Sequence, residues 1–152
     1  MQDYKQTHDG LFAYQYPRPS VTADSVLFAK KNGDMYVLLI QRGNEPYKDY
    51  WAFPGGFLNM DETVAHCAER ELEEETGIRI RGMQLAGVYS DVERDPRGRV
   101  ITAAYTAMTT MPEAIAADDA AAAKWWPLKA LPELAFDHAT ILKDAMRILK
   151  IE

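Results

Sequence analysis

Hydrophobic residues along the chain fall into short runs that are separated by polar or glycine-containing segments. Runs rich in β-branched and apolar residues are typical of strands, and a largely apolar run indicates a strand buried on both faces. The predicted strands are Val21–Ala29, Met35–Ile40, Trp51–Phe53, Met83–Tyr89, Val100–Thr109 and Lys124–Leu128. The Asn32–Gly33 pair between the first two predicts a tight hairpin turn.

Two segments have the character of helices. Thr63–Thr76 is the clearer one, and Gly77 stands where a helix C-terminal glycine belongs. Asp137–Lys150 carries apolar residues at helical spacing. Ala114–Ala123 is biased toward small residues and fits either a loop or a weak helical turn, whereas Pro54–Gly56 predicts a break. This order of hairpins and helices predicts an α/β (α+β) fold, a mixed β-sheet with helices packed on its faces.

Composition narrows the class of protein. A length of 152 residues predicts a single domain over residues 1–152. The 17 basic and 23 acidic residues give a net charge of −6, which argues against a nucleic-acid-coating surface. Cys67 is the only cysteine, so a reducing, cytoplasmic location is expected. No run approaches the roughly 18 apolar residues of a membrane span, so no membrane partner is expected.

Candidate functional side chains are most concentrated in the first predicted helix, which carries three glutamates on one side. At about 100° per residue, Glu75 lies about 40° from Glu71, and Glu74 lies about 60° to its other side. The same side carries an apolar stripe of Val64, Cys67 and Ala68. The opposite side carries Glu62, Glu69 and Glu73. The stripe should face the protein, and the three carboxylates continue it.

Three carboxylates crowded on a partly buried face repel one another and lose hydration. Basic partners or bound cations relieve this, and Arg70 is placed to brace the acids. Mg²⁺ accepts a few carboxylate oxygens while it keeps water and substrate phosphate in its other positions. The alternative is a solvated, Glu-rich helix with local pairs to Arg70 and Arg79. Helix geometry alone leaves both interpretations open.

The segment Gly56–Ile78 resembles the signature of the Nudix hydrolases, G-x5-E-x7-R-E-U-x-E-E-x-G-U, where U is a bulky aliphatic residue, and no position departs from it. The resemblance implies a mixed sheet sandwiched between helices, with the signature forming a loop-helix-loop. It also implies hydrolysis of a nucleoside diphosphate linked to another moiety, with Mg²⁺ or Mn²⁺ as cofactor. By the same resemblance, Glu71, Glu74 and Glu75 match the metal ligands, so Glu74 and Glu75 are also candidate catalytic residues.

The remaining signature residues match supporting roles in the family. Arg70 matches the arginine that orients the acids, and Gly56 matches a backbone contact near the metal. Glu62 is expected to support the loop. Family members often take a further acid from a loop before the last strand, and Asp119 is the best match, with Asp118 next. Asp119 would bind a metal or accept the proton of the attacking water, unless it is an ordinary solvated loop acid.

The flanks are similar to those of bacterial ADP-ribose pyrophosphatases within the family. The matching stretches are Leu38–Phe57, Tyr89–Thr102 and Asp118–Leu142, and the whole likeness covers about Ser20–Leu149. A related group of transcriptional regulators carries a C-terminal winged-helix domain. No such domain is expected after Leu149, because only three residues follow it. We therefore expect no nucleic-acid partner.

Several further residues are candidates for substrate contact. Arg42, Arg97 and Arg99 are candidates for bidentate phosphate binding, against the alternative of ordinary surface arginines. Tyr50 and Trp51 are candidates for stacking on adenine, against the alternative of core aromatics. Phe136 and His138 carry the same ambiguity, and His138 has the alternative of capping the last helix.

The leading hypothesis from sequence is hydrolysis of ADP-ribose to AMP and ribose 5-phosphate. One alternative is hydrolysis of nucleoside triphosphates, oxidised ones included, or of another dinucleotide. A second alternative is a non-catalytic module that senses ADP-ribose, although a pure binder has little need to hold three acids together. The expected partner is a small nucleotide, and a homodimer is compatible with the sequence.

Overall fold

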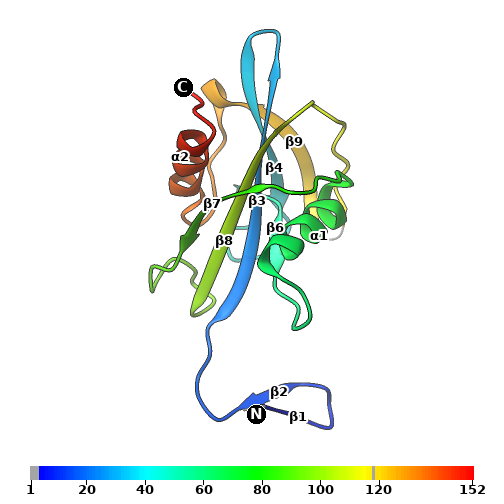
Figure 1. The fold of residues 1–152 in the computed structure, drawn as a ribbon, viewed down its shortest axis with the longest axis vertical. Coiled ribbons are helices and arrows are strands. Elements are labelled where there is room, and N and C mark those ends of the chain that lie inside the picture. The colour runs from blue at the N-terminus through cyan, green and yellow to red at the C-terminus, as the bar shows by residue number, and fades with distance from the viewer. Residues whose placement is uncertain (1–3, 118) are drawn as a thin grey trace.

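The computed structural model describes residues 4–117 and 119–152, and its centre is a mixed seven-stranded sheet (Figure 1). The hydrogen-bonded order is β5-β4-β3-β8-β7, with β6 pairing to β3 and β9 pairing to β4. The strands are β3 Ser20–Lys31, β4 Asp34–Arg42, β5 Trp51–Ala52, β6 Gly55–Phe57, β7 Gln84–Tyr89, β8 Val100–Thr109 and β9 Ala120–Pro127. The pairs are antiparallel except β3 with β8, which run parallel. The predicted mixed sheet is confirmed.

Strands β3 and β4 form the hairpin that the sequence predicts. Lys31 pairs with Asp34, and the turn residues Asn32 and Gly33 have φ values of 51° and 83°. Both values are positive, as a two-residue type I′ turn requires. The central part of β3 is buried on both faces of the sheet, because a helix lies on each side.

Alternate residues of β3 and β4 face two different cores. One core contains Val26, Phe28, Val37 and Leu39 together with Ile141, Leu142 and Ala145 of helix α2, His138–Ile148. The other contains Leu27 and Leu38 together with Leu72 of helix α1, Val64–Thr76. The two helices therefore cover opposite faces of the sheet, as Figure 1 shows.

Helix α1 ends at Thr76, as the sequence predicts, and begins at Val64, one residue after the predicted start. The Thr63 side chain accepts a hydrogen bond from the backbone N–H of His66 and caps the N-terminus. Gly77 closes the C-terminus in the left-handed conformation, and its N–H donates to the Glu73 carbonyl over 2.8 Å. These caps fix the helix register, and hence the direction in which each glutamate points.

The prediction of a break at Pro54–Gly56 is wrong in part. Gly55–Phe57 forms strand β6, which pairs with Thr22–Asp24 of β3. Glycine disfavours strands in general, but here it lets two backbones approach where a side chain would not fit. Similarly, the conformation of Ala114–Ala123 was left undecided between a loop and a weak helical turn. From Ala120 onward this segment is a strand, because β9 pairs along β4.

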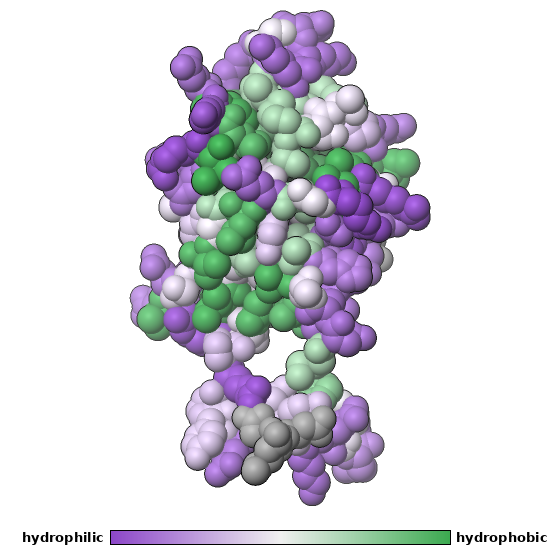
Figure 2. Space-filling model, in the orientation of Figure 1, coloured by the Kyte–Doolittle hydropathy of each residue, from purple (hydrophilic) through white to green (hydrophobic). Residues whose placement is uncertain are grey.

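An N-terminal hairpin lies outside the sequence expectations. Strands β1, Tyr4–Gln6, and β2, Phe12–Tyr14, pair only with each other and stand away from the body (Figure 1). Figure 2 shows a mostly polar surface on this hairpin and apolar residues on the viewed face of the body. A short 3-10 turn, Leu128–Ala130, links β9 to the segment before α2. Within the described ranges, no helix is long and apolar enough to cross a membrane.

Candidate active site

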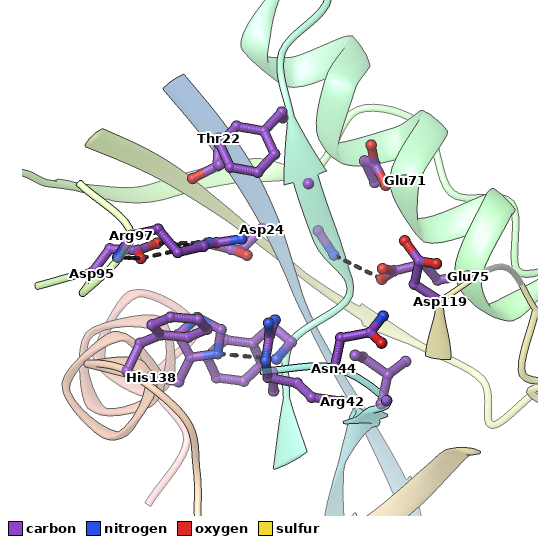
Figure 3. A pocket seen from close by; sticks show the side chains of 18 of the residues that line it. Thr22, Asp24, Arg42, Asn44, Glu71, Glu75, Asp95, Arg97, Asp119 and His138 are labelled. Atoms are coloured by element: carbon purple, nitrogen blue, oxygen red, sulfur yellow. Dashed lines mark hydrogen bonds and ion pairs between the residues drawn. The ribbon is translucent and has the colours of Figure 1, made fainter. Parts of the chain in front are cut away.

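A cleft of about 490 Å³ opens between α1, the end of β4, and the loops that follow β7 and precede α2 (Figure 3). Its two sides differ in chemistry. The side chains on one side are acidic: Glu71, Glu75 and Asp119. The side chains opposite are basic or aromatic: Arg42, Arg97 and Phe136. We call these two sets the acidic wall and the arginine wall.

Glu75 is the acid that its surroundings perturb most within the acidic wall. Its Oε2 accepts a hydrogen bond from the backbone N–H of Gly55 over 3.0 Å. Burial raises the pKa of the Glu75 carboxyl to about 8, against the lowering effect of the Gly55 hydrogen bond. Three neighbouring carboxylates, those of Glu71, Asp24 and Asp119, also raise it. Burial and the neighbouring acids thus both disfavour the ionised form of Glu75.

Two glycines bring β6 against the acidic wall. A Cβ on Gly56 would overlap the carboxyl group of Glu71. A Cβ on Gly55 would overlap the Asp24 side chain and the carbonyl of Ala23. The backbone of β6 can lie between α1 and β3 only because neither glycine carries a side chain.

Arg70 organises the acids of the signature from behind. Its Nη1 donates to Glu71 over 2.8 Å and to Glu74 over 3.0 Å. Its Nε and Nη2 form a bidentate pair with Glu62 at 2.9 and 2.7 Å, and Nη2 also donates to the Phe57 carbonyl. Hydrogen bonding to Glu62 raises the pKa of Arg70 and lowers that of Glu62 to about 2. Arg70 thus fixes the orientation of Glu71 and ties the loop before α1 to the helix.

Asp119 reaches the cleft through contacts made by its neighbours in the chain. The N–H of Ala117 donates to the Glu75 carbonyl over 3.1 Å, which docks the loop on the end of α1. Immediately afterwards, Ala120 pairs with Arg42 at the end of β4. Asp119 lies between these two anchors and therefore faces both the helix and the arginine wall. The second candidate, Asp118, lies outside the described residues.

The acidic wall suits a hard divalent cation by donor chemistry. Carboxylate oxygens are the ligands that Mg²⁺ prefers. Burial and three neighbouring carboxylates disfavour the ionised form of Glu75, and a bound cation would relieve this. Within the described ranges, however, no three Asp, Glu, His or Cys side chains already surround a metal-sized space. Of the three α1 glutamates in the signature, Glu71 and Glu75 line the cleft and are the leading candidate metal ligands. Arg70 holds Glu74 on the outer side of the helix, where its side chain is 44% exposed.

The arginine wall is built on one aromatic ring. The guanidinium of Arg42 lies 4.9 Å from the centre of Phe136, and that of Arg97 lies 5.4 Å from it. Arg97 also stacks 5.0 Å from Phe57, and its Nη2 is 2.6 Å from Asp95. Burial and the proximity of Arg97 lower the pKa of Arg42. Phe136 has φ 51°, a left-handed conformation that is uncommon for an aromatic residue.

Buried polar pairs hold the floor of the cleft. Thr102 donates from Oγ1 to the carboxylate of Asp24 over 2.7 Å. The Arg94 side chain is only 4% exposed and forms a bidentate pair with Asp137 at 2.7 and 2.8 Å. This pair fastens the loop after β7 to the start of α2. It therefore positions the loop that brings Asp95 and Arg97 into the lining of the cleft.

Comparison with known proteins identifies the family to which this site belongs. Residues 18–145 match the family model of the NUDIX domain. The chain belongs to the Nudix family. Glu71 and Glu75 of the acidic wall therefore lie on the signature helix of a Nudix pyrophosphohydrolase, and the arginine wall lies opposite them.

Three relatives place this Nudix hydrolase more closely. It is 43% identical over 132 residues to an ADP-ribose pyrophosphatase of Methanocaldococcus jannaschii, a match that covers 87% of this chain and 76% of the relative. It is 37% identical to the ADPR responsive transcriptional repressor NtrR of Acinetobacter baylyi, over 86% of this chain but only 54% of that protein. The NUDIX domain of Shewanella oneidensis NrtR, solved with ADP ribose, has a TM-score of 0.83 and 32% identity, covering 88% and 90% of the two chains.

Some residues proposed from sequence for the Nudix site lie away from the cleft lining. Arg99 turns to the Asp91 carbonyl, 3.4 Å from its Nη1. Trp51 packs against Trp126 with ring centres 5.1 Å apart, which favours the core alternative. Tyr50 is 38% exposed and contacts another tyrosine. By contrast, Gly56, Glu71, Glu75, Arg42, Arg97 and Asp119 all line the cleft.

The prediction for the far side of the signature helix needs correction. Glu62 precedes α1, and its side chain is only 6% exposed because it binds Arg70. Glu69 accepts from the Gly82 N–H over 3.0 Å, and Glu73 pairs with Arg79. The helix therefore has ion pairs on both sides. The helical wheel failed for Glu62 because that residue is not in the helix.

Sequence reasoning missed several residues that line the Nudix cleft or hold its loops in place. Asp24 gave a usable signal, because an acid inside an apolar strand needs a partner. Arg94 and Asp137 gave none, since their pairing joins segments far apart in the chain. Phe136 and His138 were left between core and site, and both line the cleft.

Proposed function

We propose that this Nudix hydrolase cleaves the diphosphate of ADP-ribose, releasing AMP and ribose 5-phosphate, with Mg²⁺ or Mn²⁺ as cofactor. The observation that carries the proposal is the cleft itself, in which Glu71, Glu75 and Asp119 face two arginines across a space of small-ligand size. The 43% identity to an ADP-ribose pyrophosphatase supports the choice of substrate.

Each wall has its own task in this proposal. Glu71 and Glu75 would hold the cation, and Glu74 is the third candidate ligand. A bound divalent cation would neutralise phosphate charge and lower the pKa of an attacking water. Arg70 keeps Glu71 in place. Arg42 and Arg97 bind the diphosphate or the adjoining sugar through their fixed N–H donors.

Asp119 is our proposed acceptor for the proton of the attacking water. It faces the cleft beside Glu75, at the end of a loop held by a hydrogen bond to the helix. The water oxygen forms a bond to one phosphorus, its proton passes to the carboxylate, and the bond to the bridging oxygen breaks. Positioning and charge stabilisation supply most of the catalysis in such reactions.

The test is a substrate panel with purified protein. ADP-ribose, nucleoside triphosphates and dinucleotides are incubated with and without Mg²⁺, and products are separated by chromatography. We expect AMP from ADP-ribose only in the presence of the divalent ion. Faster release of a monophosphate from a triphosphate would move the substrate assignment to the triphosphates. An absence of turnover across the whole panel would defeat the enzymatic proposal.

A sensing role is the second candidate, because the solved NUDIX domain of Shewanella oneidensis NrtR binds ADP ribose and aligns over most of both chains. In that case the cleft would bind ADP-ribose and leave it intact. Calorimetric titration distinguishes the two roles, because tight binding without AMP release supports sensing and rapid loss of ligand supports hydrolysis.

A further inference from the structure

His138, the first residue of α2, does not cap that helix, because the N-cap is Asp137. It is 4% exposed and lines the cleft. Its ring stacks on Phe53 with centres 4.8 Å apart and planes at 16°, and Phe136 contacts it at 5.6 Å. These contacts fix the plane of the imidazole (Figure 3).

The hydrogen bond made by His138 determines which nitrogen carries the proton. Nδ1 accepts from the backbone N–H of Phe53 over 3.1 Å. In a neutral imidazole, the nitrogen that does not accept is the donor, so Nε2 carries the proton. Burial lowers the pKa of His138, which favours this neutral form.

The charged groups around the ring act in both directions. Asp24 and Asp137 raise the pKa of His138, whereas Arg94 and Arg42 lower it. Because Asp137 is paired with Arg94 and Asp24 accepts from a threonine, each acid already has a partner. The ring therefore stays neutral without an ion pair of its own.

Nε2 has no acceptor within the described ranges, yet it is not sealed in the interior. In the part of the chain that the structure describes, Nε1 of Trp126 is the single buried side-chain nitrogen or oxygen without a hydrogen-bond partner. Nε2 of His138 is therefore open to the cleft. A rigid, neutral donor in a ligand cleft is the type of group that fixes the orientation of a ligand.

We propose that His138 is a specificity-determining residue whose Nε2–H donates to an uncharged acceptor of the nucleotide substrate, a sugar hydroxyl or a base nitrogen. This rests on the proposed function. An uncharged acceptor fits because Asp24 also lines the cleft and would repel a phosphate placed there. Arg42 and Arg97 supply the charged donors that a phosphate requires.

Two substitutions separate the roles of the two ring nitrogens. In His138→Asn the amide oxygen takes the place of Nδ1 and still accepts from Phe53, but no donor remains at the Nε2 position. In His138→Gln the longer side chain returns an amide N–H near that position. We expect H138N to raise the KM for ADP-ribose about fivefold with little change in kcat, because one neutral hydrogen bond is lost. H138Q should recover part of this loss.

An NMR experiment on the unmutated protein avoids any effect of substitution on folding. Imidazole ¹⁵N spectra should show the Nε2–H tautomer, and AMP or ribose 5-phosphate should shift the Nε2–H resonance. Inorganic pyrophosphate should leave it unchanged. A shift of the Nε2–H resonance with pyrophosphate would overturn the proposal. So would the absence of a shift with AMP, ribose 5-phosphate and ADP-ribose, or an unchanged KM in H138N.

The outcome for the unmutated protein separates this inference from the proposed function. If that protein binds ADP-ribose without cutting it, the hydrolase proposal fails, and calorimetry of H138N still tests His138 through a weaker Kd. If it cuts ADP-ribose and H138N behaves identically, only the His138 proposal fails. If it neither binds nor cuts ADP-ribose, both fail together.

Discussion

The two walls of the cleft are assembled in different ways. The acidic wall draws two of its three acids, Glu71 and Glu75, from a single helix, where the 3.6-residue repeat places them together. Its third acid, Asp119, comes from the loop before β9. The arginine wall draws Arg42 from the end of β4, Arg97 from the loop after β7 and Phe136 from the segment before α2. Most of one wall is thus local in sequence, and the other exists only when distant segments meet.

This difference separates chemistry from recognition. A local motif keeps its geometry when the surrounding loops change, because helix hydrogen bonds set it. A wall of loop residues can change contact by contact without disturbing the helix. We infer that the acidic wall carries the reaction and that the arginine wall carries the choice of substrate.

The largest effect should come from the acidic wall. Glu75→Gln removes the charge that would bind the cation but retains the Gly55 hydrogen bond, so kcat should fall roughly 10²–10³-fold. Glu73→Gln is the matched control, because Glu73 lies on the same helix and pairs with Arg79 outside the cleft. Steady-state kinetics with ADP-ribose measures both variants. Equal rates for the two would remove Glu75 from the reaction.

A smaller effect should come from the arginine wall, and it should fall on substrate binding. Arg97→Ala removes a guanidinium stacked on Phe57 and Phe136, and we expect kcat/KM to fall about tenfold, mostly through KM. Arg99→Ala is the control, because Arg99 lies in the same loop but turns to the Asp91 carbonyl. If R99A is impaired as strongly as R97A, the placement of the loop is wrong.

The Glu62–Arg70 ion pair behind the acidic wall should make the free energy of unfolding depend on pH. The pKa of Glu62 is lowered from 4.5 to about 2 by Arg70, so the pair stabilises the fold fully above pH 4.5. As pH falls from 4.5 through about 2, protonation removes that stabilisation. Glu62→Gln should therefore lower the free energy of unfolding by about 2 kcal/mol at neutral pH. Urea titrations should show this difference shrinking toward pH 2, and a constant difference would contradict the pairing.

The smallest effect should be at Cys67, which lies behind the acidic wall. Its side chain is fully buried, and burial raises the pKa of the thiol to about 12. We expect no reaction with a thiol reagent at neutral pH in the folded protein and complete reaction in urea. Rapid labelling of the folded protein would show that α1 opens readily from β6.

Much of the fold was readable from the chain because local rules agree with the tertiary structure. Val100–Thr109 is β8 without adjustment, and the Asn32–Gly33 turn forms as its residues require. Gly77 ends α1 for a similar local reason, because the chain turns there through a left-handed conformation that glycine adopts without strain. By contrast, Gly55–Phe57 became a strand only because β3 offered it a partner.

The sequence by itself therefore determined the signature helix, its caps and the acids on its face, since all depend on contacts within a few residues. Only the tertiary structure decided that Arg97 faces the cleft and Arg99 does not, because the buried Arg94–Asp137 pair orients their loop. It also decided that His138 presents a fixed donor, because that requires the backbone of Phe53, 85 positions earlier in the chain. Such pairings depend on how strands and loops are packed, and no local pattern encodes them.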